Sequence, residues 1–389
     1  MIYLFKQSYF FKHIDNMLYI VTESYVPNTA STNRILAYIR AFAELCVAAR
    51  VIFFQPDSRG SKCNIDFHNI EFFYMWDHHY INIPILKKLS YRYYITKFVR
   101  SLRSGDIVYV YGVPDLVVEL SKRKDISVFV ERTEHNKVFF RGLSKRISIQ
   151  EFLNACRIIN GVVVISHGLR NDYINNGCLP EKVHVVNMIV DTTRFVGLQK
   201  TTSEKYIAYC GTASNNKDGV DQLIKAFAIV AKQHSDYKLY IIGKTPSKDQ
   251  RFENFELVKT LGVEDKVIFT GGVSANEIPQ LLKNAAILAL DRPDNMQAKY
   301  GFPTKLGEYL LTENPVVITG VGDVPLFLKD GESALIAEPD NPQDFANKIC
   351  WAIEHPTEAK VIGEKGCEIA KSSFNYITET KKLLKIINS

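Results

Sequence analysis

The feature that most constrains the fold is a series of short apolar runs, rich in β-branched and aromatic residues, that recur at wide intervals. In the first half these runs are LYIV (18–21), VIFF (51–54), IVYVY (107–111), VFVE (128–131), VVVI (162–165) and VHVV (183–186). They lack the strict alternation of a half-exposed strand, so both faces of each strand should be covered, as in parallel sheets. Crossover helices fit into the intervals between the runs. The pattern predicts an α/β fold with a doubly wound sheet.

The pattern pauses in the polar stretch VGLQKTTSEK (196–205) and then begins again. The later runs are YIAYC (206–210), KLYIIG (238–243), VIFTG (267–271), AILAL (286–290), VVIT (316–319) and ALIA (334–337). One intervening helix is well marked, because Leu223, Phe227, Val230 and Ala231 of DQLIKAFAIVAKQH fall on one face. A chain of 389 residues is also too long for one ordinary core. We therefore expect two tandem Rossmann-like domains, with a ligand at the strand ends where they face each other across a cleft.

The expected organisation has five parts. They are an N-terminal extension (1–16), a first domain (17–195), a linker (196–205), a second domain (206–370) and a C-terminal helix (371–389). Lys6, Lys12 and Asp15 interrupt the apolar patches of the extension, which makes it a poor signal peptide. The last segment has a helical pattern with Tyr376, Leu383, Leu384 and Ile387 apolar. Periodicity alone does not decide which of the two domains this helix packs against.

Composition argues against several classes of site. The seven cysteines are scattered and show no C-x-x-C spacing, which indicates reduced thiols in a cytoplasm. No two aspartates are spaced D-x-D, the usual way of holding a divalent ion on a nucleotide diphosphate, so no metal or other cofactor is expected. No apolar run approaches the roughly 20 residues of a spanning helix.

The basic charge is concentrated in ILKKLSYRYYITKFVRSLR (85–103), which contains no acidic residue. Basic residues interleaved with aromatic and aliphatic ones suit an anionic membrane surface or another polyanion. A solvated helix with one face packed on the core explains the pattern equally well. Nucleic-acid binding would require several such clusters, and the chain has one. We expect a cytoplasmic protein, peripheral at the inner membrane face if this stretch binds lipid.

Three features of the second half favour phosphate binding. In YCGTASNNKDGV, Gly211 lies at a strand end and Lys217 follows after small polar residues. Another strand ends on Gly243, although its surroundings do not match a P-loop. Finally, Gly301-Phe302-Pro303 precedes a helix whose first turn holds Thr304 and Lys305. The free amides of such a turn favour an anion, but Pro at that position is also ordinary turn chemistry. Glu308, one turn further, could accept hydrogen bonds from the vicinal hydroxyls of a ribose.

These blocks, together with VEDKVIFTGGVSANEIPQLLKNA, YGFPTKLGEYLLTENPVVIT and DGESALIAEPDNPQDFANKI, resemble retaining glycosyltransferases of family four, of the capsule and O-antigen type. The first half resembles them more loosely, through LYIVTESYVPNTASTNR, VVVISHGLRNDYI and KVHVVNMIVDTTRF. The resemblance implies the GT-B architecture, a nucleotide diphosphate sugar donor, and a glycan or lipid-linked saccharide as acceptor. It also implies that the C-terminal helix crosses back to the first domain.

The resemblance implies a role for each matched residue. Lys217, Lys305 and Glu308 would serve catalysis. The donor would be bound by Gly211, Thr212, Val273, Tyr300, Gly301, Phe302, Pro303 and Thr304. On the acceptor side the candidates are Glu131, Glu134 and His135 of VERTEH.

Two departures leave alternatives open. Tyr300 stands where the family has the first glutamate of its E-x7-E motif, and Thr212 where it has an arginine. A non-catalytic relative that only binds nucleotide or glycan would explain both, and transfer or slow donor hydrolysis would exclude it. A sugar-nucleotide epimerase or phosphorylase on the same architecture is the third reading. It requires conversion of free nucleotide sugar without an acceptor.

Overall fold

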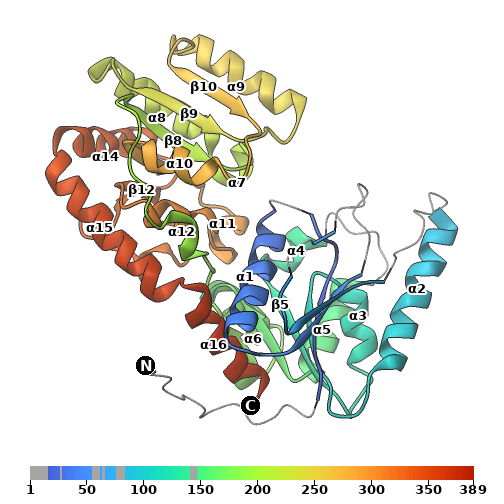
Figure 1. The fold of residues 1–389 in the computed structure, drawn as a ribbon. Helices are drawn as coiled ribbons and strands as arrows, with labels where there is room; N and C mark the ends of the chain where they lie inside the picture. Colours follow the sequence, from blue (N-terminus) through green and yellow to red (C-terminus); the bar gives the residue numbers. More distant parts are fainter. Residues whose placement is uncertain (1–15, 27–28, 55–61, 64–65, 76–83, 141–146) are drawn as a thin grey trace, which may run out of the picture.

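Two parallel sheets, one in each half of the chain, organise the computed structural model (Figure 1). The structure describes residues 16–26, 29–54, 62–63, 66–75, 84–140 and 147–389, with the backbone alone for 84–88. All but Asn16 of the expected N-terminal extension lies outside these residues.

The first sheet has seven parallel strands in the order β3-β2-β1-β4-β5-β6-β7. They are β1 Leu18–Thr22, β2 Ala49–Phe53, β3 Ile70–Tyr74, β4 Ile107–Tyr111, β5 Ser127–Arg132, β6 Gly161–Val164 and β7 Val183–Val185. Leu18 pairs with Ile107 and Tyr19 with Arg50, so β1 lies between β2 and β4. The order reverses there, which is the topological switch point of a doubly wound sheet.

The second sheet has six parallel strands in the order β10-β9-β8-β11-β12-β13. They are β8 Tyr206–Cys210, β9 Lys238–Ile242, β10 Val267–Gly271, β11 Ile287–Leu290, β12 Val316–Thr319 and β13 Leu335–Ala337. The switch point falls between β8 and β11, so the loops that follow these strands open at one edge.

Helices cover both faces of each sheet (Figure 1). Those of the first half are α1 Ala30–Glu44, α2 Pro84–Ser101, α3 Pro114–Leu120, α4 Asn136–Phe139, α5 Ile149–Ile158, α6 His167–Asn175 and the 3₁₀ turns η1 Pro180–Lys182 and η2 Thr192–Phe195. Those of the second half are α7 Asn215–Asp218, α8 Val220–Gln233, α9 Lys248–Thr260, α10 Ile278–Asn284, α11 Met296–Tyr300, α12 Lys305–Leu311, α13 Val324–Phe327, α14 Pro342–Glu354, α15 Pro356–Ser373 and α16 Tyr376–Ile387.

Strand β1 shows why the apolar runs do not alternate. Leu18 and Ile20 pack with the cluster that contains side chains of α1 and α16, whereas Tyr19 and Val21 pack with side chains of α2, α3 and α5. All five residues of β1 are buried. The predicted doubly wound α/β fold is confirmed, and each predicted run forms a strand. The strand that was not predicted is β3, an edge strand whose exposed positions include Glu71.

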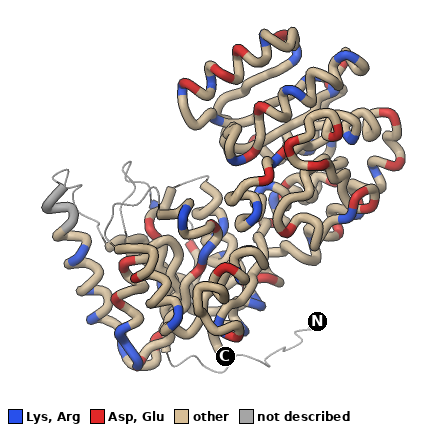
Figure 2. The backbone as a smooth tube through the Cα atoms, turned by 180° about the vertical axis from the view of Figure 1, so that it is seen from behind, with Lys and Arg blue, Asp and Glu red and all other residues tan. Residues whose placement is uncertain are grey.

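Helix α2 contains the basic stretch. Tyr91, Ile95 and Phe98 are buried against the sheet, whereas Arg92, Lys97 and Arg100 are exposed. Blue segments recur along this helix at the outer edge of the first domain in Figure 2. The side chains of Lys87 and Lys88 lie outside the described set. No helix among the described residues is long and apolar enough to cross a bilayer.

The C-terminal segment returns to the first domain. Helix α15 ends at Ser373, and α16 packs against α1, with Leu383, Leu384 and Ile387 inside the first domain's apolar cluster. The Tyr376 hydroxyl donates to Glu44 (2.6 Å), and the Asn187 amide donates to Glu379 (2.6 Å). At the crossing, the amide of Val190 donates to the carbonyl of Phe374 (2.8 Å).

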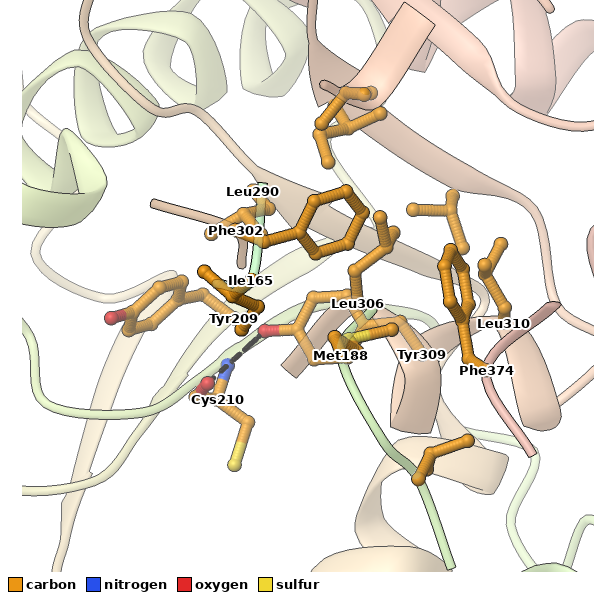
Figure 3. Close-up of a cluster of buried hydrophobic side chains, with 14 of the residues drawn as sticks. Ile165, Met188, Tyr209, Cys210, Leu290, Phe302, Leu306, Tyr309, Leu310 and Phe374 are labelled. Carbon is orange, nitrogen blue, oxygen red and sulfur yellow. Dashed lines mark hydrogen bonds between the residues drawn. The ribbon is translucent and has the colours of Figure 1, made fainter. Parts of the chain in front are cut away.

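An apolar cluster joins the two domains around α12 (Figure 3). Leu306 and Leu310 of α12 pack with Phe302 and Phe374, and Ile165 and Met188 reach them from the first domain. Gly307 makes the approach possible, because a Cβ there would lie 2.7 Å from the Met188 Cε and 2.9 Å from the Val190 Cβ. The position of α12 therefore depends on residues 188–190.

We expect Gly307→Ala to lower the free energy of unfolding by about 1–3 kcal/mol through overpacking. Met188→Ala alone should cost about 2–4 kcal/mol through the cavity that it leaves. The double variant should lose less than the sum by about 1 kcal/mol, because the new Cβ occupies space that Met188 vacates. Urea unfolding of the four proteins measures this coupling. The control pair is Gly307→Ala with Leu120→Ala in α3, whose effects on the free energy of unfolding should add. Additive effects in the pair of Gly307→Ala and Met188→Ala would contradict the packing described.

Candidate functional site

The candidate site begins at two glycines that follow neighbouring strands. Gly211 comes directly after β8 with φ +152°, and Gly243 comes directly after β9 with φ +132°. A Cβ on Gly243 would collide with the carbonyl oxygen of Gly211, and one on Gly211 would collide with the Lys305 Nζ. The glycines therefore let the two strand ends and a lysine of α12 share one small volume.

Lys305 is held there by two polar side chains and an aromatic ring. Its Nζ donates to the Asp218 Oδ2 (2.5 Å) and to the Tyr209 Oη (3.0 Å), and it lies 4.6 Å from the centre of the Tyr209 ring. Burial lowers the pKa of Lys305, and the neighbouring Asp218 opposes that shift. The lysine is thus a positioned charge at the strand ends.

Asp218 is a site residue that sequence reasoning missed. The side chain is buried at the end of α7, and it also accepts a hydrogen bond from the Tyr209 hydroxyl (2.7 Å). Burial by itself would raise the pKa of Asp218, but Lys305 and the two hydrogen bonds outweigh it, and the pKa is lowered. An Asp before a Gly is typical of a turn, so the sequence offered little signal for a buried partner of Lys305.

Glu308 lies one turn further along α12 and is paired with Arg194 of η2. The same guanidinium donates through Nη2 to the carbonyl of Ala275 (2.9 Å), in the loop that also contains Val273. Burial raises the pKa of Glu308, and Arg194 opposes the shift. Arg194 was not predicted; it links the expected ribose-binding glutamate to the loop that contains Val273, one of the expected donor-binding residues.

Lys217 faces the first domain across the boundary. Its Nζ lies 3.8 Å from the Glu134 Oε1, and the Gln297 side-chain amide donates to the same oxygen (3.4 Å). The Lys217 and Glu134 side chains are 46% and 37% exposed, so water screens this contact and a ligand could replace it.

Tyr300, in place of the expected glutamate, connects the domains. Its ring lies against the ring of His135, with centroids 4.6 Å apart, and its carbonyl accepts from the Ser166 hydroxyl (2.5 Å). His135 also accepts at Nδ1 from the Lys137 amide (3.2 Å) and lies 3.4 Å from the Asp172 carboxylate at Nε2. A second contact joins the His167 amide to the Asp323 Oδ2 (2.7 Å).

Glu131 is the prediction that the structure contradicts most directly. Its side chain is buried, and its carboxylate pairs with Arg34 and accepts from the hydroxyls of Tyr38 (3.2 Å) and Tyr109 (2.7 Å). Both oxygens are used inside the first domain, which leaves none for an acceptor. The apolar run that contains Glu131 gave no indication of a buried arginine opposite it.

Most of the remaining residues predicted to bind the donor could reach it only through backbone atoms. The Phe302 ring packs against Phe327 and Phe374, so Phe302 has only its backbone to offer a donor (Figure 3). Gly301 and Pro303 are buried, Thr304 precedes α12, and Thr212 is exposed with its carbonyl bonded to the Tyr209 hydroxyl (2.7 Å).

A separate cavity of about 920 Å³ lies between α2 and strands β1–β3, and none of the predicted site residues lines it. No group of three His, Cys, Asp or Glu side chains in the described part of the chain could hold a metal.

Comparison with protein families finds a match in the second domain. Residues 204–355, less than half of the chain, match the family model described as Glycosyl transferases group 1. The whole chain has the GT-B fold, as the likeness to solved structures shows.

Anabaena HepE, solved in complex with UDP, superposes with a TM-score of 0.72 at 19% identity, covering 96% of this chain and 99% of HepE. A glycosyltransferase from Rickettsia africae gives a TM-score of 0.72 at 15% identity, with 96% and 98% covered. Among curated relatives, mannosylfructose-phosphate synthase of Agrobacterium fabrum is 23% identical over 67% of this chain, and a putative colanic acid biosynthesis glycosyltransferase of Salmonella typhimurium is 24% identical over 55%. The chain spans 56% and 52% of the length of these two relatives.

We expect Arg194→Met to lower the free energy of unfolding by about 1–3 kcal/mol, because it leaves Glu308 partly buried without its cation. Without Arg194, burial holds the folded-state pKa of Glu308 above its unfolded value. The folded state then binds the proton more tightly, so stability falls as pH rises through that window. The loss should therefore be larger at pH 8 than at pH 5, as measured by urea unfolding.

Adding Glu308→Gln to Arg194→Met should recover most of the loss, because a neutral amide needs no counter-charge. Arg50→Met is the matched control: its partner Glu71 is 59% exposed, and the change should cost less than about 1 kcal/mol. An Arg194→Met loss that is the same at both pH values would contradict the pairing.

Proposed function

We propose that the protein is a glycosyltransferase that moves a sugar from a nucleotide diphosphate sugar to a glycan or lipid-linked saccharide, with retention of configuration and without a metal. The observation that carries this proposal is that α12 presents Lys305 and Glu308, one turn apart, at the β8 strand end and beside the first domain. The match of residues 204–355 to the group 1 family model and the named relatives support the same activity.

In this proposal the donor lies along the strand ends of the second domain. Lys217, Lys305 and the backbone from Gly301 to Thr304 bind the diphosphate, where positive charge stabilises the leaving group. Glu308 accepts hydrogen bonds from the ribose, and backbone near Val273 contacts the base. Arg194 already bridges Glu308 and the Ala275 carbonyl, so it would keep these two contacts at a fixed separation.

The acceptor would enter from the first domain, beside Glu134 and His135. The carboxylates described above each face a cation, Glu308 with Arg194, Asp218 with Lys305 and Glu134 with Lys217, so none of the three is assigned as a nucleophile. Retention would then follow from attack on the face from which the diphosphate leaves, with a departing phosphate oxygen taking the proton of the acceptor hydroxyl. Contact between the domains would exclude water from the reacting sugar.

Thermal unfolding with UDP, GDP, ADP, CMP and dTDP, alone and linked to sugars, tests the donor site. A nucleotide at about 100 times its Kd adds about 2.7 kcal/mol to the native state, which should raise the midpoint by a few degrees. One base should give this shift, and Glu308→Gln should remove most of it. Glu332→Gln, a change of the same type at a 61% exposed side chain, is the control. No shift with any nucleotide would overturn the proposal.

Binding without transfer or donor hydrolysis would instead favour the non-catalytic alternative, which Tyr300 and Thr212 motivate. Conversion of free nucleotide sugar in the absence of an acceptor would favour an epimerase or phosphorylase.

A role in surface polysaccharide synthesis, at the cytoplasmic face of a membrane, is the finer part of the proposal. The exposed basic residues of α2 support this role, as does the name of the Salmonella relative. Arg92, Lys97 and Arg100 changed together to Gln should lower binding to phosphatidylglycerol vesicles by about 100-fold, because each basic residue near such a surface contributes about 1 kcal/mol. Lys360, Lys365 and Lys371 of α15 changed to Gln provide a control of equal charge. Equal binding of the two triple variants would argue against α2 as the membrane contact.

A further inference from the structure

Arg292 is a buried arginine at the donor site that no pattern in the sequence singled out. It follows β11 by two positions and is 2% exposed. Its backbone is fixed to the end of β12, because its amide donates to the Thr319 Oγ1 (2.9 Å) and the Thr319 hydroxyl donates to its carbonyl (2.7 Å). The side chain therefore leaves from a rigid point at the switch point of the second sheet.

The guanidinium lies beneath α7 and α11 but is poorly paired. Its Nε donates to the Lys217 carbonyl at 3.4 Å, and its Nη2 donates to the Gln297 carbonyl at 3.5 Å, which are long distances for such bonds. Its Nη1 is buried and has no hydrogen-bond partner among the residues that the structure describes. An unpaired buried donor is costly, so a purely structural arginine would be expected to make better bonds.

The local charge is also unbalanced. The carboxylate nearest to Arg292 is Asp218, whose Oδ1 lies 3.8 Å from the Arg292 Nε. The other oxygen of Asp218 is committed to Lys305 at 2.5 Å. Two largely buried cations thus share one buried carboxylate, and the neighbouring Lys217 has only the half-exposed Glu134 opposite it. A buried net positive charge lowers the stability of the folded protein, and binding of an anion would offset that loss.

We propose that Arg292 is a buried cation of the donor site, which supplies positive potential at the diphosphate in place of the arginine that Thr212 replaces. The proposal rests on the proposed function, because its anion is the diphosphate of the donor. Arg292 lies below Lys217 and Lys305 and acts on the phosphates through the low-dielectric interior, so it strengthens phosphate binding and leaves the nucleoside contacts unchanged.

The test uses calorimetry to compare, in wild type and Arg292→Met, the binding of a nucleoside diphosphate with the binding of its nucleoside. The pair is the one whose base stabilises wild type in the thermal panel: UDP and uridine, GDP and guanosine, ADP and adenosine, CDP and cytidine, or dTDP and thymidine. The diphosphate that binds wild type should bind the variant about 10- to 100-fold more weakly, since one buried unit charge is removed near it. Affinity for the matching nucleoside should change less than about twofold. Equal losses for diphosphate and nucleoside would indicate a structural role, and no loss would indicate no role; either result overturns the inference.

Two variants control for charge and for folding. Arg292→Lys keeps the charge and should stay within about threefold of wild type for the diphosphate, whereas a tenfold loss would contradict an electrostatic role. Lys329→Met removes an exposed charge from the same domain and should change neither affinity. If Arg292→Met does not fold, Arg292→Gln supplies the same comparison. Failure of wild type to bind any nucleotide of the thermal panel would overturn the proposed function itself, which is a different outcome from equal binding by wild type and variant.

Discussion

The close packing of α12 on residues 188–190 is the contact on which the rest of the site depends. Helix α12 has one apolar side, with Leu306 and Leu310 in the cluster shared by both domains. The lack of a side chain at Gly307 brings its backbone against Met188 and Val190. Its other side can then hold Lys305 at the end of β8 and Glu308 beside Arg194. A short helix that carries two functional charges is thereby fixed by apolar contacts to elements far away in the sequence.

Lys217, Lys305 and Glu308, the predicted charges of the site, each have a partner within the protein. Glu308 has Arg194 from η2, Lys305 has Asp218 from α7, and Lys217 has Glu134 from the first domain. Binding a donor would exchange these contacts for others, so affinity would be the difference between two sets of electrostatic interactions. The buried pair of Lys305 and Asp218 holds its geometry, whereas the half-exposed pair of Lys217 and Glu134 is the easiest to exchange.

The sequence predicted the α/β class, the two sheets and the buried face of α8, because runs covered on both faces leave a strong apolar signal. It did not predict β3, since an edge strand with Glu71 exposed resembles a polar connection. The predicted charges Lys217, Lys305 and Glu308 do lie at the domain boundary. Arg194 and Asp218, the partners of Glu308 and Lys305, were missed, as was Arg292, because an ion pair between residues far apart in the sequence leaves no local pattern. Glu131 was assigned to the acceptor for the same reason, as nothing near it in the sequence reveals Arg34.

The two places where the chain passes between the domains lie side by side. Val190 and Asn375 form a parallel bridge, and the Val190 amide donates to the Phe374 carbonyl at 2.8 Å. Because these two crossings are bonded to each other, a rotation of one domain relative to the other would be expected to turn about this point. Gly307 contacts Val190, so α12 lies close to the axis of such a rotation and would be displaced little by it. Helices α4 and α7 lie further from the crossing than α12 does (Figure 1), so the same rotation would displace the contact between Glu134 and Lys217 more than it displaces α12.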